Sequence, residues 1–149
     1  LSQTDPNLFL VLAGGGELGI AETEYLRRSG TLDKVIQVSV TDNQLNTLYK
    51  NALCFVYPSL YEGFGLPILE AFKNNCPVLL SNCSCFPEIA GNAVHYFDHQ
   101  YLESLIEQLN LIISDENISS NMIELGKSRL LQFPMEACIN NTIEVYKNL

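Results

Sequence analysis

The chain has 149 residues, 47% of them hydrophobic and 17% charged, and its 8 basic and 17 acidic residues give a net charge of −9. This length predicts one domain with a substantial core, and the acidic balance argues against nucleic-acid binding, which usually shows as a basic patch. No apolar run approaches the roughly 20 residues of a membrane span, and the polar first residues do not resemble a signal peptide.

The first third of the chain alternates apolar runs with helical patterns. The run at 8–13 is continuously apolar, which is typical of a buried parallel strand. Thr41 and Asp42 are residues that can cap a helix. The predicted elements are a strand at 8–13, a helix at 17–29, a strand at 35–40, a helix at 43–51 and a strand at 52–56.

A glycine-rich segment, Gly14–Gly19, matches the G-x-G-x-x-G pattern between a predicted strand and a predicted helix. This is the dinucleotide fingerprint, and it would make the chain part of an NAD-dependent oxidoreductase. Such a site needs an acid at the end of the second strand, but Asp33 precedes that strand and Asp42 lies past it in a capping position. Glu17 would also place a like charge at the pyrophosphate. The other interpretation is a plain glycine turn between strand and helix.

Two acids, Glu62 and Glu70, flank the segment Gly63-Phe64-Gly65 between the strand at 52–56 and a predicted helix at 67–74. Backbone N–H groups at a helix start bind anions, and glycines let the backbone approach a ligand. The carboxylates can accept hydrogen bonds from hydroxyls, so the pattern predicts a nucleotide-sugar site. The alternative is that both are solvated acids, which the helix dipole favours near a helix start.

The rest of the chain continues the alternation and then becomes helical. Predicted elements are a strand at 78–80, a short helix at 86–90 stopped by Gly91 and a strand at 93–97. Three helices follow, over 102–113, from Asp115 or Asn117 to about 133, and from 134 onwards. This order predicts an α/β, Rossmann-like parallel sheet with helices on both faces and a helical C-terminal tail. Ligands of such sheets bind at the carboxyl ends of the strands.

The cysteines and histidines do not indicate a metal or redox site. The five cysteines are an odd number, which argues against a disulfide framework. Cys83 and Cys85 are spaced too closely for the usual zinc knuckle, and we expect no metal. Reduced cysteines favour the cytoplasm. Asp98 and His99 follow a strand, but an acid–base role needs a positioned partner.

The acids and the blocks around them resemble one family along nearly the whole chain. Glu62 and Glu70 match the Glu-x7-Glu motif of retaining glycosyltransferases of the GT-B fold, glycosyltransferase family 4 (group 1), in the C-terminal, donor-binding domain. The flanking blocks that are similar to the family are Pro58-Ser59, Glu70-Ala71-Phe72, Pro77-Val78-Leu79-Leu80-Ser81, Phe86-Pro87-Glu88-Ile89-Ala90-Gly91-Asn92-Ala93 and Val145-Tyr146.

The resemblance implies roles for matching residues. Glu62 would contact donor-sugar hydroxyls near the reaction centre, and Glu70 would accept hydrogen bonds from the nucleotide ribose. Backbone N–H groups of Phe64, Gly65 and Leu66, with Gly63 beside them, would face the sugar and the diphosphate. The base would lie near residues 39–42, where backbone groups of Val40 could contact it; a plain strand-to-helix turn is the alternative there.

The resemblance also implies an activity. The full-length enzyme would move a sugar, with retention, from a UDP- or GDP-sugar to a glycan or lipid acceptor in polysaccharide or lipopolysaccharide synthesis. It would need no cofactor and no metal, and it would work in the cytoplasm, with peripheral association at the inner face of the membrane as one option. Residues 1–149 would be one nucleotide-sugar-binding domain of a two-domain enzyme, inactive alone. The acceptor-binding domain and the Arg/Lys pair that neutralises the diphosphate would lie outside it. A non-catalytic module of the same fold is a further alternative.

Overall fold

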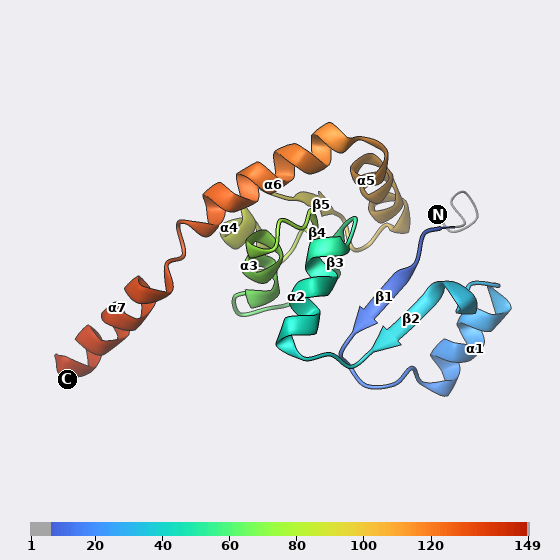
Figure 1. Cartoon of the computed structure of the whole chain (residues 1–149), viewed down its shortest axis with the longest axis horizontal. Coiled ribbons are helices and arrows are strands. Elements are labelled where there is room, and N and C mark those ends of the chain that lie inside the picture. Colours follow the sequence, from blue (N-terminus) through green and yellow to red (C-terminus); the bar gives the residue numbers. More distant parts are fainter. Residues whose placement is uncertain (1–6, 149) are drawn as a thin grey trace. The chain divides into compact units, whose positions relative to one another are not determined.

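The computed structural model describes residues 7–148, which fall into two compact units, one ending at Thr47 and one beginning at Leu48 (Figure 1). The helix α2 (Asp42–Asn51) contributes residues to both units. Thr41 precedes it: its carbonyl accepts the Leu45 N–H, and its own N–H donates to the Gln44 side chain at 2.9 Å. This is the returning half of a capping box. One domain over residues 1–149 stays a prediction.

The first unit is a parallel pair of strands joined by a helix. β1 (Leu10–Ala13) pairs with β2 (Val35–Val38), with Leu10 opposite Val35 and Ala13 opposite Val38. The helix α1 (Ile20–Arg28) and the short 3-10 turn η1 (Leu32–Lys34) connect them. The parallel pairing is confirmed, whereas the predicted burial of the first strand is wrong, because Leu10 is 51% exposed. Within the described unit β1 pairs with one strand, β2, and none of its residues is buried.

Three parallel strands in the order β3-β4-β5 form the sheet of the second unit. The strands are β3 (Phe55–Tyr57), β4 (Val78–Ser81) and β5 (His95–Phe97). They are joined by α3 (Leu66–Lys73) and α4 (Phe86–Ala90). All of these elements are predicted by the sequence to within three residues at each end. The loops that follow β3 and β4 therefore lie at the same edge of the sheet.

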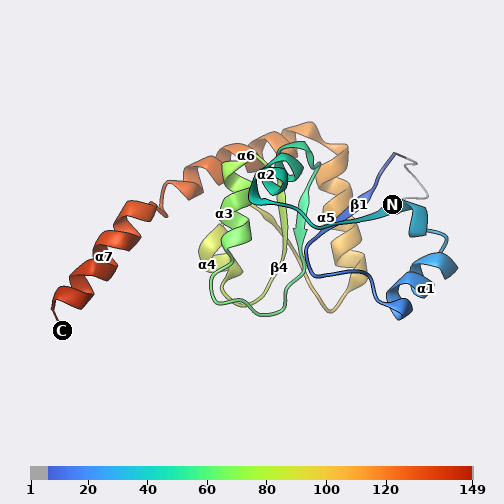
Figure 2. The same ribbon diagram turned by 60° about the horizontal axis from the view of Figure 1, so that its bottom comes forward.

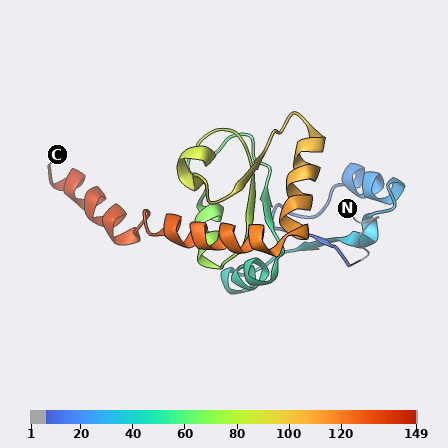
Figure 3. The ribbon, with the colours of Figure 1, turned by 90° about the horizontal axis from the view of Figure 1, so that it is seen from above.

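Helices cover both faces of this sheet, as predicted. Leu79 and Val56 pack in one cluster with Ile112 of α5 (Leu102–Ser114) and Met122 of α6 (Glu116–Leu130). Successive strand residues point to opposite faces, and Tyr57, which follows Val56, packs its ring against Phe86 of α4. Figures 2 and 3 show α6 running beside α3.

The last helix is α7 (Met135–Lys147), which begins after Pro134 and buries none of its residues (Figure 1). The predicted helical tail is confirmed by α5, α6 and α7. Among the described residues, no helix combines the length and apolar character needed to cross a membrane.

Candidate functional site

The predicted site lies on the segment between β3 and α3, residues 58–65, which we call the motif loop. Gly65 ends this loop as the N-cap of α3, with a φ of 93° that side chains rarely adopt. A Cβ at Gly65 would stand 3.0 Å from Ile68 Cδ1 and 3.2 Å from Phe86 Cε1. The packing around position 65 thus leaves no room for a side chain, whereas a Cβ at Gly63 would meet nothing within 4 Å. Gly63 is the glycine of this loop with open space beside it.

A second loop, residues 81–85 after β4, holds the motif loop from the side; we call it the clamp loop. Two of its side chains reach the carbonyl oxygen of Ser59: the Ser81 hydroxyl donates to it, and the Cys83 thiol does so at 3.2 Å. The Cys85 thiol donates to the carbonyl oxygen of Phe64 at 3.3 Å. The carbonyl groups of Ser59 and Phe64 are therefore turned toward the clamp loop.

Ser84 connects the two loops through two hydrogen bonds to one residue, Glu62. Its hydroxyl donates to the carbonyl oxygen of Glu62 at 2.9 Å and accepts the Glu62 N–H at 3.2 Å. Ser84 has a φ of 53°, which is uncommon for a residue with a side chain. Such outliers persist where the surroundings over-determine the backbone, so Ser84 fixes the backbone of the first motif acid.

Removing the Ser84 hydroxyl should loosen Glu62 without adding strain. In Ser84→Gly the backbone keeps its left-handed conformation at no steric cost, and the Glu62 N–H loses its acceptor. We expect hydrogen exchange of the Glu62 amide to speed up about tenfold, the effect of losing one to two hydrogen bonds. Asn75→Gly, at the other described non-glycine position with positive φ, is the matched control and should leave that amide unchanged. Equal exchange in all three proteins would contradict the clamp.

The backbone N–H groups of Phe64, Gly65 and Leu66 face no protein acceptor within the described part of the chain. They come just before and at the first turn of α3, where the helix leaves its N–H groups unpaired. Phe64 and Leu66 are exposed whereas Gly65 is buried, so the N–H groups of Phe64 and Leu66 are the donors that an incoming anion or sugar oxygen would meet first.

The Glu62 carboxylate is held by a residue that the sequence analysis did not single out. The Tyr57 hydroxyl donates to Glu62 Oε1 at 2.5 Å. This bond, and to a lesser degree Ser59, holds the pKa of Glu62 below its ordinary value. Burial, and then the bond to Glu62, raises the pKa of Tyr57 to about 12. At neutral pH Glu62 is therefore a carboxylate and Tyr57 a neutral donor.

The second motif acid, Glu70, sits on α3 with its side chain exposed. Its Oε2 accepts a hydrogen bond of 3.3 Å from the hydroxyl of Tyr49, which is buried in the core. Burial, and then Glu70, raises the pKa of Tyr49. Glu70 is thus tethered at one oxygen while the carboxylate remains open to solvent, as a group that binds hydroxyls must be.

Phe64 and Leu66, the predicted residues on either side of Gly65, are exposed to 38% and 60%. The Phe64 ring meets that of Phe133 edge-on at 5.7 Å, and the Arg129 guanidinium lies 5.3 Å from the same Phe133 ring. Arg129 Nε donates to the Ile89 carbonyl oxygen at 2.8 Å. Arg129 thereby caps the end of α4 and supports Phe64 through Phe133.

Val40 belongs to the first unit, where it is half-buried between the end of β2 and the start of α2. The predicted strand at 35–40 ends at Val38, so Val40 lies in a connecting turn. A role for Val40 in contacting the base stays a prediction.

The geometry of the glycine segment does not favour the dinucleotide alternative. In that fingerprint the pyrophosphate meets a helix N-terminus and the third glycine packs the helix on its strand. Here Gly19 precedes α1 as its N-cap, and its N–H donates to the Glu22 carboxylate at 2.7 Å. An acid already occupies the place that an anion would need.

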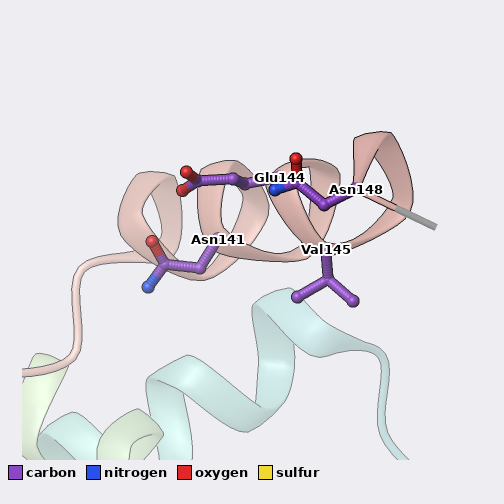
Figure 4. Close-up of a pocket in the computed structure, with 4 residues that line it drawn as sticks. All are labelled: Asn141, Glu144, Val145 and Asn148. Carbon is purple, nitrogen blue, oxygen red and sulfur yellow. The ribbon is translucent and has the colours of Figure 1, made fainter.

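Metal ligation and the hollow on the last helix do not compete with the motif loop in the described part of the chain. Over residues 7–148 no three His, Cys, Asp or Glu side chains gather as metal ligands would. A shallow hollow on α7 is lined by Asn141, Glu144, Val145 and Asn148 (Figure 4). These side chains all come from one helix, whereas the motif loop contacts Tyr57 of β3 and the clamp loop.

Known proteins of one family resemble the chain. The model of the family "Glycosyl transferases group 1" matches residues 1–129. O-antigen chain mannosyltransferase B of Escherichia coli is 38% identical over 110 residues, which are 74% of this chain and 29% of that protein. The chain thus spans less than a third of the length of this relative.

Solved structures show the same fold. Sucrose-phosphate synthase of Thermosynechococcus elongatus matches with a TM-score of 0.81 at 23% identity, over 93% of this chain and 38% of that one. Anabaena HepE in complex with UDP matches with a TM-score of 0.82 at 18% identity, over 99% and 43%. They confirm the predicted Rossmann-like α/β fold of a GT-B domain. Because the family model covers most of its residues, the chain belongs to the group 1 glycosyl transferases.

Proposed function

We propose that the motif loop binds the donor of a sugar transfer, a nucleoside-diphosphate sugar, and that the chain is the donor-binding part of a retaining glycosyltransferase. One observation carries this proposal: the clamp loop holds the carbonyl groups of Ser59, Glu62 and Phe64, while the N–H groups of Phe64, Gly65 and Leu66 have no protein acceptor in the described chain. Donors for anionic oxygens and the Glu62 carboxylate, an acceptor for hydroxyls, thus belong to one short segment, as the binding of a sugar diphosphate requires.

Each group has a chemical task in this site. The N–H groups bind oxygens of the sugar and the diphosphate, whose negative charge grows as it leaves. The ionised Glu62 accepts hydrogen bonds from sugar hydroxyls near the anomeric carbon, where an oxocarbenium-like charge develops. Glu70 accepts from the ribose hydroxyls, because charge-assisted hydrogen bonds are about twice as strong as neutral ones.

The comparisons suggest which donor to test first. The Escherichia coli relative is named an O-antigen chain mannosyltransferase, which favours a mannosyl donor and an acceptor in lipopolysaccharide synthesis. HepE was crystallised with UDP, so UDP- and GDP-sugars are both candidates. We propose that the donor is the only small molecule required, with no cofactor or metal, that the reaction takes place in the cytoplasm, and that acceptor binding and turnover need parts of the protein beyond this chain.

Glu70→Ala should weaken nucleotide binding. Loss of the carboxylate leaves the ribose hydroxyls without an acceptor. This lowers the binding free energy by about 1–3 kcal/mol, which raises Kd roughly 5- to 150-fold. Isothermal calorimetry with UDP and GDP measures the change directly. Glu136→Ala, which removes an exposed acid of α7, is the matched control for net charge and should bind like the unmodified chain. Equal affinity of Glu70→Ala and the unmodified chain would contradict the ribose role.

A further inference from the structure

A row of aromatic rings runs beneath the motif loop. Tyr49 meets Phe55 edge-on at 5.2 Å, Phe55 stacks on Tyr57 at 5.6 Å with 30° between the planes, and Tyr57 lies 5.2 Å from Phe86 at 35°. Aromatic contacts at these distances add to the stabilisation that burial alone provides. The ring of Tyr57 is thus held between two neighbours, and its hydroxyl has a defined direction.

The Tyr57 hydroxyl donates a hydrogen bond to Glu62, the first acid of the motif. The distance of 2.5 Å between Tyr57 Oη and Glu62 Oε1 is at the short end for an O–H···O bond to a carboxylate. The Glu62 backbone is fixed independently by both hydrogen bonds to Ser84. The Glu62 carboxylate is thus held at Oε1 by Tyr57, with a smaller contribution from Ser59, and its backbone is held by Ser84.

We propose that Tyr57 is a positioning residue of the donor site: its hydroxyl orients the Glu62 carboxylate toward the donor sugar. The role in sugar binding rests on the proposed function, whereas control of the Glu62 carboxylate by Tyr57 does not. Two other ionisable groups interact with Tyr57 electrostatically: Cys85 of the clamp loop and Tyr49 of α2.

Tyr57→Phe isolates the hydroxyl, because the ring and its two stacking contacts remain. Carbon-detected NMR can follow the Glu62 side-chain carboxyl through a pH titration in the unmodified chain and in the variant. We expect the pKa of Glu62 to rise toward its ordinary value in Tyr57→Phe, since the donor that favours the charged form is gone. Tyr49→Phe is the matched control. It also removes a tyrosine hydroxyl from the row of rings, but that hydroxyl donates to Glu70, so the pKa of Glu62 should stay unchanged. An unchanged Glu62 pKa in Tyr57→Phe would overturn the proposal.

A second measurement separates this role from the donor site itself. Calorimetry gives the affinities of the unmodified chain and of Tyr57→Phe for UDP and UDP-glucose, and for GDP and GDP-mannose. If Tyr57 orients Glu62 toward the sugar, Tyr57→Phe lowers the affinity for the sugar nucleotide by about two- to tenfold, the effect of one hydrogen bond, and leaves that for the free diphosphate unchanged. Equal losses for both ligands would overturn the sugar-facing part. If the unmodified chain binds none of the four, the donor-binding claim for this chain fails, while the Glu62 titration still decides whether Tyr57 controls the carboxylate.

Discussion

Phe86→Ala is expected to lower the free energy of unfolding by about 3–5 kcal/mol, the range for removing a fully buried aromatic ring. Phe86 is 0% exposed and begins α4 directly after the clamp loop. Its ring touches the Tyr57 ring and would lie 3.2 Å from a Cβ at Gly65. The substitution therefore leaves a cavity directly beneath the motif loop.

Urea unfolding followed by far-UV circular dichroism measures this loss as a shift of the transition midpoint. Leu60→Ala, in the motif loop but 64% exposed, is the matched control and should stay within about 0.5 kcal/mol of the unmodified chain. Phe86→Leu should fall between the two, because it keeps part of the apolar volume. A loss below 1 kcal/mol for Phe86→Ala would show that the ring does not support this edge of the sheet.

Gly65→Ala should be the second most damaging change, lowering the free energy of unfolding by about 2–5 kcal/mol. A left-handed φ costs an alanine roughly 1–2 kcal/mol, and crowding in a packed core adds about 1–3 kcal/mol. Both apply, because Gly65 has a φ of 93° and a Cβ there would press on Ile68 and Phe86.

Gly63→Ala is the natural control for Gly65→Ala, since it makes the same chemical change two residues earlier in the same loop. A Cβ at Gly63 has open space, and its φ lies outside the left-handed region, so stability should be unchanged within about 0.5 kcal/mol. The same urea titration compares them. Equal stabilities of the two variants would contradict the loop conformation described above.

Local patterns predicted most of the second unit because the signals there are strong and close in sequence. The short helix α4 ends at Gly91, which has a φ of 57°, and the helix after the motif begins at Leu66, next to Pro67, which favours a helix start. In the first unit, Gly14–Gly19 looked like the start of a helix, but α1 begins only at Ile20, because Glu22 folds back to cap Gly19. The glycine pattern alone does not indicate at which residue the helix begins.

Tertiary contacts of the site could not be predicted from local patterns. The spacing of Cys83 and Cys85 raises only the question of a metal site, whereas their thiols and the Ser84 hydroxyl between them hold carbonyl groups of a loop more than 20 residues away. The sequence gives no reason to assign a role to Tyr57, because a tyrosine at the end of a strand usually packs in the core. Only the structure shows that its hydroxyl donates to Glu62. One signal was available: polar residues that follow two neighbouring parallel strands share an edge of the sheet.

The central claim is that the motif loop binds a nucleotide sugar, and an amide NMR titration of the chain with UDP and GDP, and with NAD for comparison, tests it most directly. The account predicts that UDP or GDP shifts the amide signals of Gly63, Phe64, Gly65 and Leu66, and that NAD leaves those of Gly14–Gly19 in place. Shifts confined to Gly14–Gly19, with the motif loop unmoved by UDP and GDP, would contradict it.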